Sequence, residues 1–329
     1  DRNIHLGIKP FWTELDAKMM AATNFRENYL QHNFGNEEVA LSKQEYLKQT
    51  EEEKVIAKQI KCIPQLRAQN QNNIDNTKLS FVQDKDIEFF AKEHIYVYKK
   101  FIQLKAVSDV ISMFFRKFDS ISWSRKKALG NGISQRCQLE QWDCKGAESR
   151  EVGTYLHEQI HKHFIRETPD FAYHFQYNGE EVHVDKIVDI STEYTYFKKF
   201  LNEENIIPFR TEWQIFDPVL RIAGTIDFLS RNDSEFDLYD WKRSDKIDRN
   251  ATVWSYGING LESVPDTRYY HYCLQLNMYK YILEKNYNIA INKMYLVVLH
   301  PVYNTYQKIE VPTMTNVVNS IIGYYQTIA

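Results

Sequence analysis

The chain has 329 residues, a formal net charge of −3, 43% hydrophobic residues and 26% charged residues. This balance excludes wholesale disorder, and the low content of Gly (11) and Pro (8) excludes a collagen-like or linker-dominated chain. No apolar run approaches the roughly 18 residues of a membrane span, and no signal peptide begins the chain. We therefore expect an intracellular protein with reduced cysteines, cytoplasmic in a bacterium or a phage-infected cell.

The N-terminal part of the chain differs in texture from the rest. Residues 1 to about 66 have a helical pattern, and Ser42-Lys43-Gln44-Glu45 has the spacing of a capping box. Residues 67–78 are rich in amide side chains, as expected of an exposed loop. We predict a helical region and linker over 1–78, without a functional signal, and a second domain over 79–329. Because the first residue is not Met, we expect a piece of a longer protein.

The second region predicts alternating strands and helices. β-branched and aromatic residues in 95–104 predict a hairpin, and 108–115 a short helix. The later elements are a helix at 147–166, strands at 206–216, 219–230 and 236–242, a helix at 267–285, a strand at 293–300 and a helix at 314–325. From residue 147 the order is α-β-β-β-α-β. We predict a mixed α/β (α+β) fold with a mixed central sheet flanked by helices.

Two carboxylates and a lysine lie on neighbouring predicted strands. Asp240 and Lys242 are two residues apart and share a strand face, whereas Trp241 points to the opposite face, into a core. Asp227 lies on the preceding strand, so the two carboxylates meet if the strands pair as a hairpin. Convergent carboxylates suit Mg²⁺ or Mn²⁺, and a lysine beside them can neutralise charge that develops on a phosphate. Together these groups suffice for metal-assisted phosphodiester hydrolysis.

Further motifs surround this stretch in a specific order. They are Gly153-x-x-x-His157 on a helix, Glu212 on the first strand, Gly224-x-x-Asp227 on the second, Asp240-x-Lys242 on the third and Gln275-x-x-x-Tyr279 on the next helix. In this arrangement, which covers about residues 94–302, the chain resembles the PD-(D/E)xK nucleases, in particular their RecB-type and phage-type exonucleases. The resemblance implies a restriction-endonuclease-like αβββαβ core.

The resemblance also implies a role for each matching residue. His157, Asp227 and Asp240 would be metal ligands, with the Trp241 backbone carbonyl as a further ligand. Lys242 would be the catalytic lysine, and Glu212 an indirect ligand. The remaining members, Gln275, Tyr279 and Arg243, would support the site or contact DNA. The implied cofactor is Mg²⁺ or Mn²⁺. We expect no iron–sulfur cluster, because Cys137, Cys144 and Cys273 lie near but the C-terminal cysteines of cluster-bearing relatives are absent.

These implications predict a metal-dependent deoxyribonuclease. No base-reading module such as a helix-turn-helix is visible, so we expect an exonuclease or a structure-directed nuclease, with exonuclease favoured, rather than a sequence-specific enzyme. DNA is the expected partner, and the sequence leaves open whether it is single- or double-stranded. No Walker motif occurs, so a helicase or recombination partner would belong to another chain or to another part of a longer protein.

Two alternatives compete with this interpretation. His157-Glu158-Gln159-Ile160-His161 fits the His-Glu-x-x-His pattern of zinc metalloproteases, in which two histidines one turn apart bind Zn²⁺. The sequence that follows lacks the metzincin extension, and this interpretation leaves Asp227, Asp240 and Lys242 unexplained. The other alternative is a non-catalytic nuclease fold kept for DNA binding, which the intact Asp and Lys residues disfavour.

Overall fold

The structure, a computed structural model, describes residues 87–90, 94–99, 102–204, 206–232 and 235–328. The helical region predicted at 1–78 lies outside the described residues. Within them the elements are, in order, β1 (Ile87–Phe90), β2 (Ile95–Tyr98), β3 (Ile102–Ala106), α4 (Val107–Ser112), α5 (Ser120–Asn131), α6 (Gln135–Phe164), β4 (Ala172–Asn178), β5 (His183–Asp189), α7 (Ser191–Glu203), β6 (Ile207–Asp217), β7 (Ile222–Asn232), β8 (Glu235–Lys242), α8 (Arg268–Asn286), β9 (Ile291–Val298), β10 (Gln307–Glu310) and α9 (Thr315–Ile328).

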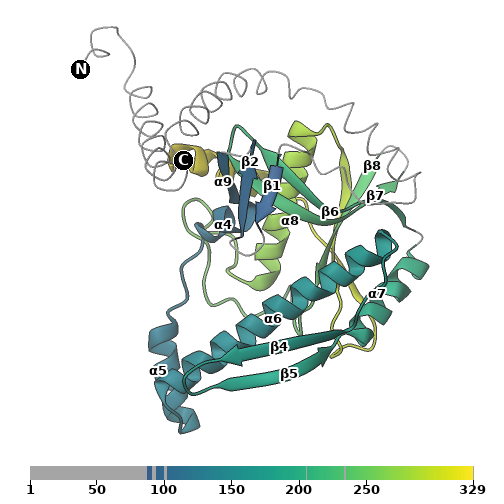
Figure 1. Cartoon of the computed structure of the whole chain (residues 1–329). Coiled ribbons are helices and arrows are strands. Elements are labelled where there is room, and N and C mark those ends of the chain that lie inside the picture. Colours follow the sequence, from purple (N-terminus) through teal and green to yellow (C-terminus); the bar gives the residue numbers. More distant parts are fainter. Residues whose placement is uncertain (1–86, 91–93, 100–101, 205, 233–234, 329) are drawn as a thin grey trace, which may run out of the picture. The chain divides into compact units, whose positions relative to one another are not determined.

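A mixed sheet forms the centre of the described fold (Figure 1). Its order is β1-β2-β3-β7-β8-β9-β10, with β6 paired to β7. The β3–β7 and β8–β9 pairs are parallel, and the other pairs are antiparallel. The fold is therefore mixed α/β with a mixed central sheet, as predicted, and the predicted β2–β3 hairpin is confirmed.

One edge of β7 has no paired strand along its middle part, among the described strands. On the opposite edge β6 pairs with Ile222 to Ile226 and with Phe228 to Arg231, and the register shifts between Pro208 and Arg210. On the open edge β3 pairs only with Ile222 and Ala223, and β8 begins to pair only at Phe228. Residues 224–227 thus lie where β3 and β8 diverge, and among the described strands none pairs with them there. Such divergence creates a crevice at the sheet, and Asp227 lies in it.

Helices cover both faces of the sheet and separate two hydrophobic cores. Helices α4, α8 and α9 pack on one face around Leu238, Leu296 and their neighbours. Helices α6 and α7 pack on the other face around Trp241 and Val297. Residues that alternate along β8 and β9 go to opposite cores, as the two-residue period of a strand requires. Trp241 is fully buried, which confirms its predicted direction.

Two details of the predicted elements differ in the structure, the start of one helix and the unbroken order that follows it. The helix predicted at 147–166 begins at Gln135, where the Ser134 hydroxyl accepts a hydrogen bond from the N–H of Cys137 at 2.8 Å. The predicted α-β-β-β-α-β order is also interrupted, because β4, β5 and α7 lie between α6 and β6. In β4 and β5 the apolar pattern is weak and only Phe175 is buried, whereas α7 buries Phe197 and Phe200. Elements held by polar contacts leave little periodic signal in a sequence.

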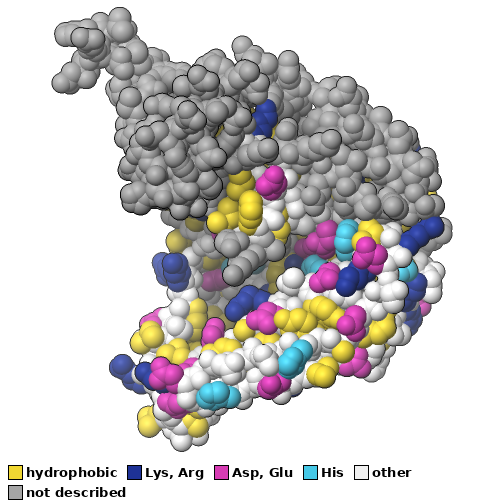
Figure 2. Space-filling view, in the orientation of Figure 1, with side chains coloured by type: hydrophobic (Ala, Val, Ile, Leu, Met, Phe, Trp, Pro, Cys, Tyr) yellow, Lys and Arg dark blue, Asp and Glu magenta, His cyan; other side chains and the backbone are white. Residues whose placement is uncertain are grey.

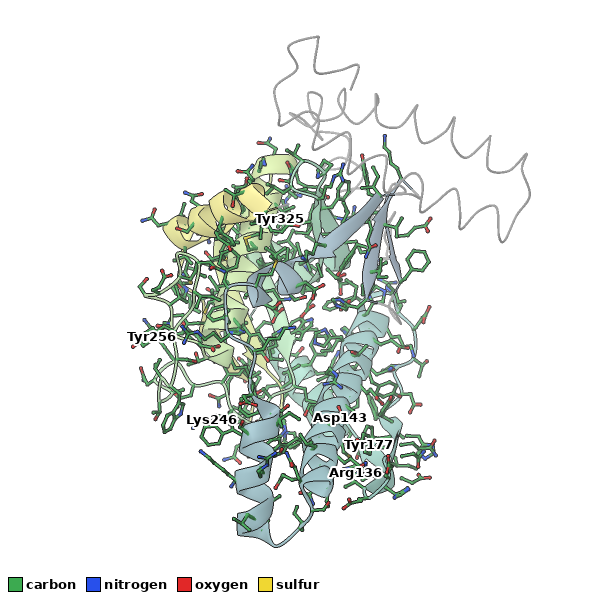
Figure 3. All side chains as sticks on the ribbon, turned by 90° about the vertical axis from the view of Figure 1, so that its left-hand side faces the viewer. Arg136, Asp143, Tyr177, Lys246, Tyr256 and Tyr325 are labelled. Carbon is green, nitrogen blue, oxygen red and sulfur yellow. The ribbon has the colours of Figure 1, made fainter. Side chains whose placement is uncertain are left out.

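The β4–β5 hairpin lies along the N-terminal half of α6 (Figure 3). The Tyr177 hydroxyl donates to Asp143 at 3.0 Å, and the Glu140 carboxylate accepts the backbone N–H groups of Glu180, Glu181 and Val182. On the face shown in Figure 2, this part of the surface mixes apolar, acidic, basic and histidine side chains. Within the described ranges, no helix has the length and apolar character to cross a membrane.

Candidate metal centre

The strand pair β7–β8 brings Asp227 beside the end of β8. The strands are antiparallel with Phe228 opposite Tyr239, so Asp227 lies near Asp240 and Trp241. The Asp227 Oδ2 atom accepts the Trp241 backbone N–H at 2.8 Å. This bond fixes the carboxylate at the point where the edge of β7 opens. The predicted hairpin is therefore present, and it delivers Asp227 to the mouth of the crevice.

His157 reaches the same point from α6. Its Nε2 atom lies 2.9 Å from the Trp241 carbonyl oxygen, so Nε2–H is the donor. The Nδ1 atom therefore faces two carboxylates, Asp227 Oδ1 at 3.5 Å and Glu212 Oε1 at 3.8 Å. A carbonyl that fixes one ring nitrogen leaves the other directed at a ligand. The Trp241 carbonyl thus orients His157, whereas the resemblance implied that it binds the metal.

Glu212 completes a group of three ligand side chains. Single ligand atoms of His157, Glu212 and Asp227 all lie within 4.8 Å of one another. Glu212 has φ 47 although it lies inside β6, and a left-handed residue of this kind costs about 1–3 kcal/mol. The Glu212 Oε1 atom is buried and has no hydrogen-bond donor. A buried carboxylate oxygen without a donor, beside a second carboxylate and an imidazole nitrogen, fits a divalent cation.

In the metal-free chain the electrostatics of this trio favour protonation of Glu212 and His157 and ionisation of Asp227. Burial, and next the charge of Asp227, raise the pKa of the Glu212 carboxyl to about 8. Burial disfavours the imidazolium of His157, but the charge of Asp227 and a hydrogen bond to it raise the pKa to about 9. For Asp227, burial opposes ionisation, yet the charges of His157 and Lys242 hold the pKa below its usual value. A cation that binds here displaces protons.

Asp240 pairs with Lys242 and stands apart from the trio. The Lys242 Nζ atom lies 2.6 Å from Asp240 Oδ2 and 4.5 Å from the centroid of the Tyr272 ring. Burial raises the pKa of Asp240 to about 6, although the charge of Lys242 acts in the opposite direction. Burial disfavours the ammonium of Lys242, but the charges of Asp240 and Asp227 raise its pKa. The lysine is therefore charged. The sequence did not reveal Tyr272, whose contact forms only when α8 packs on the sheet.

Gln275 and Tyr279 bond to each other rather than to Lys242. The Gln275 amide donates to the Tyr279 hydroxyl at 2.9 Å, one helical turn away. The Tyr279 ring lies directly over Gly224, where an added Cβ would come within 2.3 Å of a ring carbon. Gly224 is thus required by close packing, since any side chain there displaces the tyrosine. Both Gln275 and Tyr279 line the crevice next to Asp227.

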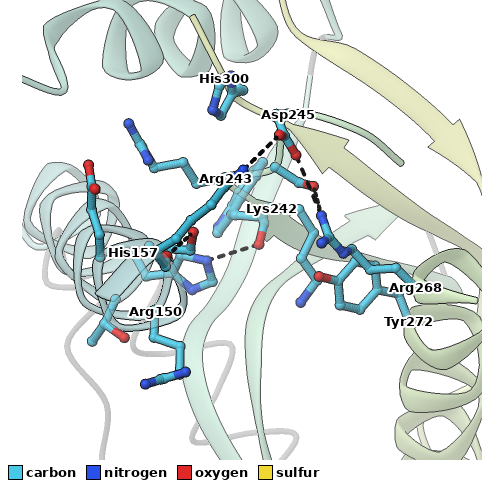
Figure 4. A pocket seen from close by; sticks show the side chains of 15 residues that line it. Arg150, His157, Lys242, Arg243, Asp245, Arg268, Tyr272 and His300 are labelled. Carbon is cyan, nitrogen blue, oxygen red and sulfur yellow. Dashed lines mark hydrogen bonds and ion pairs between the residues drawn. The ribbon is translucent and has the colours of Figure 1, made fainter. Parts of the chain in front are cut away.

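Two cavities meet at His157. One, of about 480 Å³, contains Glu212, Asp227, Gln275 and Tyr279. The other, of about 610 Å³, contains Lys242 and Arg243 (Figure 4). His157 belongs to the walls of both, whereas Glu212 and Asp227 line only the smaller one, and both cavities are open to solvent. An extended substrate can therefore pass the trio with a group in each cavity.

The zinc-site alternative gains no support from this geometry. His161 lies one turn after His157 and lines the smaller cavity, but among the described residues it joins no group of three ligand side chains. Glu158, the base in that alternative, forms an exposed ion pair with Lys162 at 3.0 Å. The ligand partners of His157 are instead the carboxylates of β6 and β7.

Comparisons with known proteins add no functional information. No protein-family model matches the chain, and no curated protein matches it. Among solved structures, the chain is similar to one described as the crystal structure of SSO0001, with 12% identity and a TM-score of 0.26 over 80% of this chain and 85% of that one. A TM-score this low does not establish a shared fold or function.

Proposed function

We propose that the chain is a metal-dependent deoxyribonuclease of the PD-(D/E)xK type that hydrolyses phosphodiester bonds, acting as an exonuclease. The observation that carries the proposal is the trio of His157, Glu212 and Asp227 beside the buried Lys242–Asp240 pair. Carboxylate-rich sites with one imidazole suit Mg²⁺ or Mn²⁺. A charged lysine at such a site suits a reaction that builds negative charge on phosphate oxygens.

The donor set fits a divalent cation. Glu212 Oε1 has no hydrogen-bond donor, and His157 Nδ1 is directed at Asp227 and Glu212. The trio, with Asp240 close by on β8, would hold the ion. When bound, Mg²⁺ or Mn²⁺ supplies a hydroxide near neutral pH and polarises the phosphate.

The remaining residues perform positioning and electrostatic roles. Lys242 carries a permanent charge and is held by Asp240 and by the Tyr272 ring. It can donate hydrogen bonds to a phosphate oxygen as charge grows there, without a change of protonation. The Trp241 backbone serves both ligands, because its N–H holds Asp227 and its carbonyl holds His157. The β8 backbone therefore aligns the ligands with the lysine on the same strand.

DNA is the proposed substrate because the larger of the two cavities is open and lined by five Lys or Arg side chains, which suits a charged polymer more than a small apolar ligand. The motif resemblance supports the same substrate. Any helicase or recombination partner would belong to another chain or to another part of a longer protein.

The test is digestion of end-labelled linear and closed circular DNA with Mg²⁺, Mn²⁺ or Zn²⁺, and of casein in parallel. We expect cleavage of linear DNA with Mg²⁺ or Mn²⁺, and a loss of about 100-fold or more in Lys242→Ala. Lys293→Ala is the matched control, because this lysine forms an exposed pair with Glu310 on β10. Near wild-type cleavage by Lys242→Ala contradicts the proposed site, and casein cleavage without DNA cleavage favours the protease.

A further inference from the structure

The larger cavity beside Lys242 has a strongly basic wall. Five cationic side chains and two acidic ones line it, and the cations come from α6, the end of β8 and the start of α8 (Figure 4). The cations are Lys145, Arg150, Lys242, Arg243 and Arg268. Burial, and next the charge of Arg243, lower the pKa of His300 in the same wall, which favours the neutral imidazole. The wall therefore presents an excess of positive charge to its contents.

Arg243 is held in this wall by a buried partner. Its Nε atom donates to Glu193 Oε1 at 2.9 Å, and the two side chains are 13% and 0% exposed. Glu193 lies in the first turn of α7, and its second carboxylate oxygen is buried without a hydrogen-bond partner. A buried ion pair with an unsatisfied oxygen is a poor source of stability. Its effect is instead geometric, because it fixes the direction of the guanidinium.

Because Glu193 accepts a hydrogen bond from Nε, the two terminal nitrogen atoms of Arg243 remain available to a ligand in the cavity. Within the described ranges these two atoms have no hydrogen bond or ion pair, although the side chain is mostly buried. Arg268, at the start of α8, lines the same cavity and contacts Ser244 Oγ at 3.0 Å and Asp245 at 3.6 Å. Guanidinium groups that line one cavity suit an oxyanion, because each can donate two parallel hydrogen bonds.

We propose that this cavity is a phosphate-binding subsite, in which Arg243, Arg268 and Arg150 bind a phosphate group and Glu193 positions Arg243. The subsite adjoins Lys242 and His157, which line the same cavity. That the phosphate belongs to a DNA strand rests on the proposed function. The phosphate is either a terminal monoester or an internal diester, and the two differ in charge by about one.

The first test measures binding of short labelled oligonucleotides in EDTA, with 5′-phosphate, 3′-phosphate or hydroxyl ends. Arg243→Met alone would leave Glu193 buried and unpaired, so the variant is Glu193→Gln/Arg243→Met. We expect the affinity to fall about tenfold or more. The slope of log affinity against log salt concentration should become shallower by about one. Lys246→Met is the control, because Lys246 lies in the same loop but does not line the cavity. Its affinity should stay within about twofold.

The oligonucleotide ends distinguish the two sources of phosphate. A loss confined to one phosphorylated end assigns the subsite to a terminal phosphate, and an equal loss for all ends assigns it to an internal phosphodiester. Unchanged affinity of the double variant for every oligonucleotide overturns the proposal.

The second test does not depend on DNA. Calorimetric titration with inorganic phosphate should show binding to wild type and none to the double variant. Phosphate binding by wild type alone, without DNA cleavage, would support the subsite and contradict the proposed nuclease activity. Equal phosphate binding by both proteins would overturn the subsite.

Glu193 is tested by two conservative changes. Glu193→Asp shortens the side chain by one methylene and draws the Arg243 guanidinium away from the cavity, so oligonucleotide affinity should fall. Glu193→Gln keeps the length and the acceptor oxygen, so affinity should match or exceed that of wild type. Thermal unfolding of both variants is measured alongside. If the two variants bind alike, Glu193 has no positioning role.

Discussion

Glu212 should make the metal-free protein less stable as pH rises. Its folded pKa of about 8 lies above the reference value of 4.5, so the folded chain binds this proton more tightly than the unfolded chain. The resulting stability is complete below pH 4.5 and is lost as pH rises through about 8. His157 acts in the same direction, because its pKa rises from 6.5 to about 9. Its contribution is complete below pH 6.5 and is lost through about pH 9.

The size of the Glu212 effect follows from the same values. A difference of about 3.5 pH units at about 1.36 kcal/mol each sets an upper bound near 5 kcal/mol. The side chain is 30% exposed, so solvent screening reduces this to about 2 kcal/mol. Glu212→Gln removes the buried charge and keeps the shape. In EDTA at pH 9 we expect this variant to melt about 4 °C above wild type, with little difference at pH 5.

The assay is thermal unfolding from pH 5 to pH 9 with EDTA or with Mn²⁺. Mn²⁺ should stabilise wild type at pH 8 and stabilise Glu212→Gln much less, because the variant lacks one ligand charge. Glu158→Gln is the matched control, since this carboxylate is exposed on the same helix as His157. The reasoning fails if Glu212→Gln and wild type have melting curves of the same shape across this pH range in EDTA.

Three further outcomes are expected. Gly224→Ala should destabilise the chain by about 1–3 kcal/mol in urea unfolding, because the new Cβ meets the Tyr279 ring; Tyr279→Leu in the same chain should restore part of the loss. His157→Ala should lose DNA cleavage and His161→Ala should retain most of it, and equal loss in both would revive the zinc alternative. Asp227→Asn should weaken Mn²⁺ binding about tenfold or more by calorimetry, and unchanged affinity would exclude Asp227 as a ligand.

Local patterns in the sequence predicted the part of the site that lies along two strands. The alternation around Trp241 was enough to separate a core face from a face with Asp240 and Lys242, because successive strand residues point to opposite sides. Apolar periodicity also located α8 and the strands β6 to β9 to within a few residues. It failed for β4 and β5, in which only Phe175 is buried, and it also missed α7, although α7 buries Phe197 and Phe200 in the core around Trp241.

Contacts between distant residues were decided by tertiary structure alone. The left-handed backbone at Glu212 turns its carboxylate toward His157, so Glu212 joins the trio while Asp240 pairs with Lys242. Arg243 pairs with Glu193, which lies 50 positions earlier on α7, a helix that the sequence did not predict. Residue types and short spacings specify which chemistry is available and on which strand face. Which side chains meet depends on strand register, a local backbone distortion and helix packing, and these are set by the whole fold.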